Sequence, residues 1–191
     1  MIKVLIVDDH ELVRSVIVKL LEQSSNIQIV AEANNGEAAL QYVHDMDIDV
    51  VLLDISMPGI SGLETTWRLM HLKRKLKVLI LTSHEDRFYI LQLLKIGAAG
   101  YLTKGASVEE LIQAICTVYE NKRYISPHAA GCLLEGVSDL NKPSVLDKLT
   151  HRELEIMFMI CRGMKPNEIA EILFVTTKTV LSYRSQLYKK L

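Results

Sequence analysis

The sequence contains few cysteines, and they are not arranged in pairs. Its three cysteines, Cys116, Cys132 and Cys161, are far apart, and no CxxC pair is present. This pattern excludes a disulfide framework and a cysteine-based zinc site, and it is typical of a reducing cytoplasm. No apolar run approaches the ~20 residues that a membrane-spanning helix requires. The first residues lead directly into a strand-like segment without a signal peptide. We therefore expect a cytoplasmic protein that has no membrane partner.

Neither sign of charge dominates the chain. The formal net charge is −1, so the whole molecule is not a polycation that coats nucleic acid. Residues 145–191, however, contain eight Lys and Arg against five Asp and Glu, whereas residues 1–144 contain fourteen against eighteen. With 191 residues, of which 49% are hydrophobic and 24% charged, the chain is long enough for two small globular domains. An acidic body with a basic end predicts two functions in one chain.

The first 120 residues alternate between two kinds of apolar pattern. Short segments rich in apolar residues predict strands at Ile2–Val7, Ile27–Ala33, Asp49–Asp54, Val78–Leu81 and Ala99–Thr103. Helical spacing of apolar residues predicts helices at Glu11–Leu21, Gly36–Met46, Gly62–Leu72, Arg87–Ile96 and Val108–Tyr119. This alternation predicts an α/β fold with a five-stranded, doubly wound parallel sheet. In such sheets the functional crevice lies beyond the C-terminal ends of the strands.

Residues 122–148 have a different character and predict a linker. Ser126-Pro127 can begin one short helix, because serine caps helices and proline suits the first turn. Ser138–Ser144 is polar and contains a proline, which is typical of an extended connection.

The end of the chain predicts a small helical domain. Thr150 and Glu153 form a capping box before an apolar-periodic segment, and Gly163 would end that helix. Pro166 begins a second helix, and a third begins near Thr177. Two helices joined by a short turn, the second with a basic outer face, are typical of a helix-turn-helix.

Charged and polar side chains stand at the predicted strand ends. Asp8 and Asp9 follow the first strand, Asp54 ends the third, Thr82 the fourth, and Lys104 follows the fifth. Three carboxylates in one crevice repel one another unless a cation is present, and hard oxygen ligands suit Mg²⁺. The alternative is that the paired aspartates only cap a helix and the lysine is a solvated loop residue.

Four segments resemble parts of the receiver domain of bacterial two-component response regulators. They are VLIVDDH, LLDISMPGISG, ILTS and GAAGYLTKG. The resemblance covers residues 2–121 and implies a flavodoxin-like receiver domain at 1–121. It implies that a sensor histidine kinase phosphorylates Asp54. It also implies roles for the neighbouring residues: Mg²⁺ bound by Asp8, Asp9, Asp54 and the backbone carbonyl of Ser56, and phosphoryl contact or switching by Thr82, Tyr101 and Lys104. On phosphorylation, Thr82 and Tyr101 would move inward.

Residues 149–191 resemble the LuxR-type helix-turn-helix of the NarL/FixJ response regulators. The resemblance includes the motifs LTxRE, NEIA and TKTV. This resemblance implies that the helix from Thr177 reads promoter DNA. The residues expected to contact DNA are Lys178, Arg184 and Lys189 at phosphates, and Leu181, Ser182 and Ser185 at base edges. Because the chain stops at Leu191, we expect this domain to lack the family's last helix. The sequence is most similar to the GacA/UvrY/LetA branch, which implies regulation of small regulatory RNA genes.

Three functional hypotheses compete. The first is a transcription factor that dimerises and binds DNA when phosphorylated. The second is a phosphatase of the haloacid-dehalogenase kind, which needs an acid two residues after its nucleophilic aspartate. Ser56 occupies that position, so we expect no enzyme. The third is a receiver-only adaptor that acts through protein contacts and has a non-functional, truncated DNA-binding domain.

The charge division also predicts how the switch works. We expect the acidic domain of the unphosphorylated chain to cover the basic helix, hiding Lys178–Lys189. Phosphorylation would then free the face formed by Arg87–Ile96 and Val108–Tyr119 to pair with a second receiver.

Overall fold

A computed structural model describes residues 1–191 except 74, 84–86, 135–147 and 162. Its sheet has the strand order β2-β1-β3-β4-β5-β6, with every neighbouring pair parallel. The strands are β1 (Ile2–Val7), β2 (Ile27–Ala33), β3 (Val50–Leu53), β4 (Lys77–Thr82), β5 (Gly100–Thr103) and β6 (Tyr124–Ile125). The doubly wound parallel sheet predicted from the sequence is confirmed, and its first five strands lie within two residues of the predicted bounds. The sixth strand was not predicted.

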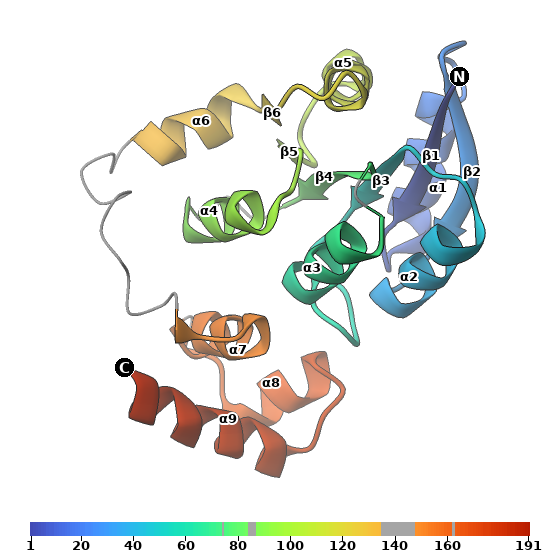
Figure 1. The fold of residues 1–191 in the computed structure, drawn as a ribbon. Coiled ribbons are helices and arrows are strands. Elements are labelled where there is room, and N and C mark those ends of the chain that lie inside the picture. Colours follow the sequence, from blue (N-terminus) through green and yellow to red (C-terminus); the bar gives the residue numbers. More distant parts are fainter. Residues whose placement is uncertain (74, 84–86, 135–147, 162) are drawn as a thin grey trace.

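Helices cover both faces of the sheet (Figure 1). They are α1 (Glu11–Leu21), α2 (Gly36–Asp45), α3 (Gly62–Leu72), α4 (Arg87–Ile96) and α5 (Val108–Tyr119). Buried residues of α1 and α5 form one apolar cluster with the sheet, and buried residues of α2, α3 and α4 form another. All four β3 residues are buried between these two layers, which explains the uninterrupted apolar run Val50–Leu53.

The sixth strand belongs to the segment that the sequence analysis assigned to a linker. β6 pairs with β5 through Gly100 and Tyr124 and through Tyr101 and Ile125. The backbone N–H of Ser126 then donates to the Tyr101 carbonyl at 3.0 Å, and α6 (Pro127–Leu134) begins at the next residue. The short helix expected after Ser126-Pro127 is therefore present, and it packs against α4. The predicted polar linker, Ser138–Ser144, lies outside the described residues.

The end of the chain folds into the three helices that the sequence predicted. They are α7 (His151–Cys161), α8 (Pro166–Ile172) and α9 (Thr177–Lys190). The capping box is present, because the N–H of Thr150 donates to Glu153 Oε2 at 2.7 Å and the N–H of Glu153 donates to Thr150 Oγ1 at 3.3 Å. Gly163 has a φ of +80°, the left-handed geometry with which glycine follows a helix.

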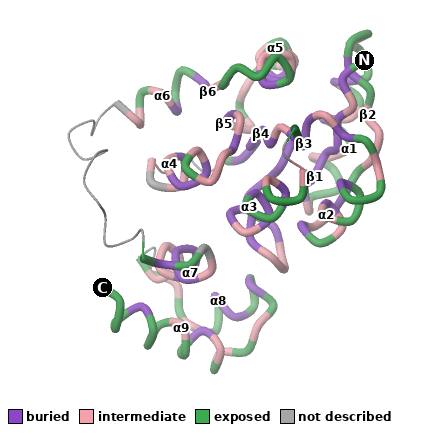
Figure 2. The backbone as a smooth tube through the Cα atoms, in the orientation of Figure 1, coloured by how far each residue is buried: buried purple, intermediate pink, exposed green. Residues whose placement is uncertain are grey.

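The small helical domain contacts the first domain through α7. In Figure 1, α7 lies between the α3–α4 side of the first domain and α9. Arg152 Nη1 donates to the Gly59 carbonyl at 3.3 Å, and the Tyr89 and Phe158 rings lie 4.5 Å apart. Figure 2 shows buried stretches on α7 and long exposed stretches on α9. In the part of the chain that the structure describes, no helix combines the length and the apolar character needed to cross a membrane.

Candidate functional site

The parallel strands bring the predicted acidic residues together at one end of the sheet. Asp8 and Asp54 are 2% and 3% exposed, and Asp9 is partly exposed. Carboxylate oxygens of all three lie within 4.8 Å of one another. The register explains this proximity, because Val7 at the end of β1 pairs with Leu53 at the end of β3. The carboxylates that directly follow both strands must therefore be neighbours.

Lys104 joins two of these carboxylates. Its Nζ lies 2.6 Å from Asp8 Oδ2 and 2.7 Å from Asp54 Oδ2. Burial by itself would lower the pKa of Lys104, but the hydrogen bonds and charges of Asp54 and Asp8 outweigh it and raise this pKa above its ordinary value. The lysine therefore stays charged, and it partly neutralises a site that would otherwise contain three negative groups.

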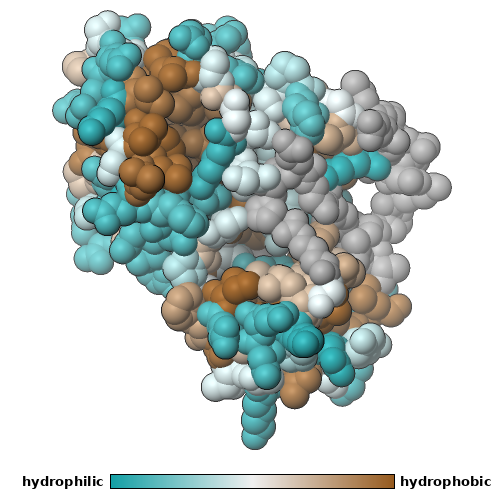
Figure 3. All heavy atoms as spheres, turned by 180° about the vertical axis from the view of Figure 1, so that it is seen from behind, coloured by the Kyte–Doolittle hydropathy of each residue, from teal (hydrophilic) through white to brown (hydrophobic). Residues whose placement is uncertain are grey.

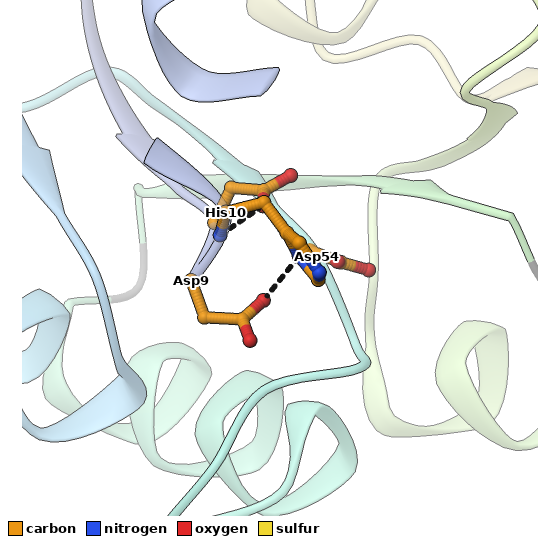
Figure 4. A group of neighbouring side chains, drawn as sticks. Asp9, His10 and Asp54 are labelled. Atoms are coloured by element: carbon orange, nitrogen blue, oxygen red, sulfur yellow. Dashed lines mark hydrogen bonds and ion pairs between the residues drawn. The ribbon is translucent and has the colours of Figure 1, made fainter. Parts of the chain in front are cut away.

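The residues present fit a divalent cation. Asp9 Oδ1 is buried and makes no hydrogen bond among the described residues. The Nδ1 atom of His10 lies 2.9 Å from it, an ion-pair contact if the imidazole is protonated (Figure 4). An oxygen left without a donor beside two further carboxylates suits a hard cation such as Mg²⁺. His10 is a member of this cluster that the sequence analysis missed, although it directly follows Asp8-Asp9 in the VDDH segment.

Thr82 and Ser56, also predicted from the sequence, contact residues of this site. Thr82 is fully buried at the end of β4, where its carbonyl accepts the N–H of Lys104 at 2.9 Å. Ser56 is exposed in the loop after β3, and its N–H donates to Asp54 Oδ1 at 3.2 Å. Tyr101 is also fully buried, in the cluster that includes Ala129 of α6. The ring is already inside in this structure, and the expected movement of Thr82 and Tyr101 on phosphorylation stays a prediction.

The predicted DNA-contacting residues share the outer surface of α9. All six are exposed: Lys178, Leu181, Ser182, Arg184, Ser185 and Lys189. Val180 and Leu187, by contrast, are buried against α7 and α8 in the core of the small domain. Lys190 has a structural partner, because its Nζ lies 2.6 Å from Glu153 Oε2. The other three cations of α9 are thus presented to solvent on a helix whose inner face is anchored.

The expected covering of α9 by the first domain is wrong. The contact between the domains is made by α7, and α9 lies on the far side of it (Figure 1). The face expected to pair after phosphorylation is engaged here, because α4 packs against α6 and its Tyr89 contacts Phe158, and its release on phosphorylation stays a prediction. A cavity of about 410 Å³ lies between the acidic site and the small domain; its lining includes Asp9 and Ser56 on one side and Glu155 and Phe158 on the other.

An apolar groove lies between α1 and α5 on the first domain. It has a volume of about 290 Å³, and its lining includes Leu12, Val16 and Leu111. Leu12 is 78% exposed and Val16 is 47% exposed. Figure 3, which shows the molecule from behind, displays a brown apolar patch on the first domain. Exposed apolar patches of this kind mark surfaces that bind other molecules.

Comparison with protein families assigns both domains. Residues 4–116 match the response regulator receiver domain, and residues 147–191 match the bacterial regulatory proteins of the luxR family. The chain is a two-component response regulator. The buried Asp54 with its partners Asp8 and Lys104 is thus in the acidic pocket of a receiver domain, and α8–α9 is in a LuxR-type DNA-binding domain.

Relatives of this response regulator match it along its whole length. It is 43% identical to the response regulator UvrY of Escherichia coli, over 100% of this chain and 88% of the relative. It is 42% identical to the response regulator GacA of Pseudomonas aeruginosa, over 100% of this chain and 90% of the relative. A solved complex of the response regulator RcsB with DNA has the same fold, with a TM-score of 0.68 at 23% identity, over 99% of this chain and 91% of that one. The similarity to the GacA/UvrY branch is confirmed.

Proposed function

We propose that this response regulator is phosphorylated on Asp54 by a sensor histidine kinase in the cytoplasm, and then binds promoter DNA as a homodimer. The observation that carries the proposal is the contact of Lys104 with both Asp54 and Asp8 at the ends of β5, β3 and β1. Asp54 is held by a strand buried on both faces, so its carboxylate has a fixed position for attack. Lys104 supplies a fixed positive charge where the phosphoryl group would arrive.

In the transfer step, a carboxylate oxygen of Asp54 attacks phosphorus and forms an acyl phosphate. The P–N bond of the kinase's phosphohistidine breaks, and its electron pair stays on the imidazole, which takes up a proton from water. Asp8, Asp9, Asp54 and the Ser56 carbonyl would hold Mg²⁺, which supplies charge neutralisation for phosphoryl oxygens. Lys104 would contact one phosphoryl oxygen, and the Thr82 hydroxyl would donate to another.

The small domain supports the DNA-binding part of the proposal. The exposed cations Lys178, Arg184 and Lys189 would contact phosphates, and Leu181, Ser182 and Ser185 would contact base edges. The RcsB complex shows that a protein of this fold binds DNA. The apolar α1–α5 groove offers a surface to a second copy of the chain, whereas α4 packs against α6 and contacts α7 through Tyr89 and Phe158. The similarity to GacA and UvrY supports small regulatory RNA genes as targets.

Intact mass after reaction with a small acyl phosphate and Mg²⁺ tests the phosphorylation site. We expect the native chain to gain one phosphoryl group and Asp54→Asn to gain none. Asp47→Asn is the matched control, since Asp47 is an exposed aspartate that pairs with Lys3 outside the acidic site. Stable labelling of Asp54→Asn would contradict the assignment, as would equal labelling of all three chains in the presence of a chelator.

A further inference from the structure

Arg14 lies outside the residues that sequence motifs and family resemblance identify, yet it contacts the backbone of the acidic site. It is in α1, and its Nη1 donates to the carbonyl of Asp8 at 2.8 Å. Its Nε donates to Glu32 Oε2 in β2 at 3.0 Å. The Arg14 side chain is only 15% exposed, whereas that of Glu32 is 44% exposed. One guanidinium group therefore connects α1, the turn between β1 and α1, and the neighbouring strand β2.

These contacts contribute more to geometry than to stability. An ion pair as exposed as Arg14–Glu32 contributes only about 0–1 kcal/mol to folding. A planar guanidinium, however, presents its N–H groups in a fixed fork, so two acceptors in different elements restrict its orientation. The Asp8 backbone is then held on both sides, because its N–H donates to the Ala33 carbonyl of β2 at 3.1 Å. The peptide group between Asp8 and Asp9 cannot rotate without breaking the contact with Arg14.

The position of that peptide group decides where two carboxylates point. Asp8 and Asp9 must both face Asp54, although like charges at this spacing repel. A site whose repelling ligands are already held in place binds a cation more tightly than one whose ligands must first be ordered. The entropic cost of ordering these side chains is then met by folding and not by binding. We propose that Arg14 is a positioning residue that fixes the β1–α1 turn so that Asp8 and Asp9 are pre-arranged for the divalent cation. This proposal rests on the proposed function of the same site.

Titration of the full chain with MgCl₂, followed by the melting temperature, tests the proposal without measuring phosphorylation. We expect Arg14→Gln to raise the half-saturating Mg²⁺ concentration about tenfold, the lower end of the effect of removing groups that orient metal ligands. Arg14→Lys should recover only a minor part of the loss, because one ammonium group cannot span both acceptors in the same way. At saturating Mg²⁺, labelling of Arg14→Gln by an acyl phosphate should approach the native rate.

Arg68→Gln is the matched control, because it also removes an arginine–glutamate pair, with Glu64 in α3, but lies outside the acidic site. The control should leave the half-saturating Mg²⁺ concentration unchanged. An unchanged value for Arg14→Gln, even with a lower melting temperature, would show a merely structural role and overturn the proposal. Full recovery by Arg14→Lys would also overturn it, because charge alone would then be sufficient. If the native chain shows no response to Mg²⁺, the metal part of the proposed function fails as well.

Discussion

Glu155 has an environment unlike that of an ordinary surface carboxylate. It is on α7, 5% exposed, and Arg152 Nη1 lies 2.8 Å from its Oε2. Burial raises its pKa to about 7, although the charge of Arg152 and hydrogen bonds from Arg152 and Ser61 oppose the rise, and the nearby Glu64 adds to it. Ser61 and Glu64 belong to the receiver, so this environment depends on the contact between the two domains.

This pKa predicts how stability changes with pH. The unfolded chain has the ordinary glutamate value near 4.5, so the folded state binds this proton more tightly. As pH rises from 4.5 through about 7, burial of the ionised carboxylate should cost progressively more, up to a few kcal/mol. Urea unfolding of the native chain and Glu155→Gln at pH 5 and pH 8 measures this difference. We expect the native chain to lose stability relative to Glu155→Gln; an identical pH dependence would contradict the assignment.

At the scale of elements, the sequence was sufficient to predict the sheet and its acidic edge, but not to predict the sheet's last strand. The five strand-like segments and the helical spacing between them predict a doubly wound parallel sheet, because central strands buried on both faces are rich in apolar residues. β6 contains only Tyr124 and Ile125, which are too few for any periodicity. It forms by pairing with β5, which would otherwise be the edge strand of the sheet. The contacts of Arg14 were also missed, since its two acceptors, the Asp8 carbonyl and Glu32, are brought together only by folding.

The β5–β6 pairing predicts that a side chain at Gly100 would destabilise the fold. A Cβ at this position would lie 2.7 Å from the Tyr124 carbonyl oxygen and 2.8 Å from Leu79 Cδ1, so backbone or core must move. We expect Gly100→Ala to reduce the free energy of unfolding by about 1–3 kcal/mol, the usual cost of overpacking. Gly131→Ala in α6 is the control, because nothing lies within 4 Å of its added Cβ. Since alanine favours helix, this control should be neutral or slightly stabilising, by up to about 1 kcal/mol. Urea denaturation of both variants checks the pair, and equal stabilities would contradict the pairing.

At the scale of the whole molecule, the two domains meet at the loop that follows Asp54. Arg152 contacts Gly59, and Phe158 contacts Tyr89 of α4, so α7 is bound where a phosphoryl group on Asp54 would alter the surface. The recognition surface of α9 is exposed in this arrangement. Steric covering of α9 therefore does not account for regulation. We infer that α7 contacts restrain the orientation of the DNA-binding domain, and that phosphorylation releases it for two-fold binding.

Duplex binding by the full chain tests most directly the claim that Asp54 phosphorylation controls DNA recognition. The probe is a duplex enriched from random sequences by the chain phosphorylated with an acyl phosphate and Mg²⁺. Binding is measured for the phosphorylated native chain, the unphosphorylated native chain and Asp54→Asn treated with the same donor, each at several salt concentrations. We predict the tightest binding for the phosphorylated native chain, weakening as salt rises, because the contacts of Lys178, Arg184 and Lys189 with phosphates release counterions. Equal affinity of all three preparations for this duplex would contradict the account.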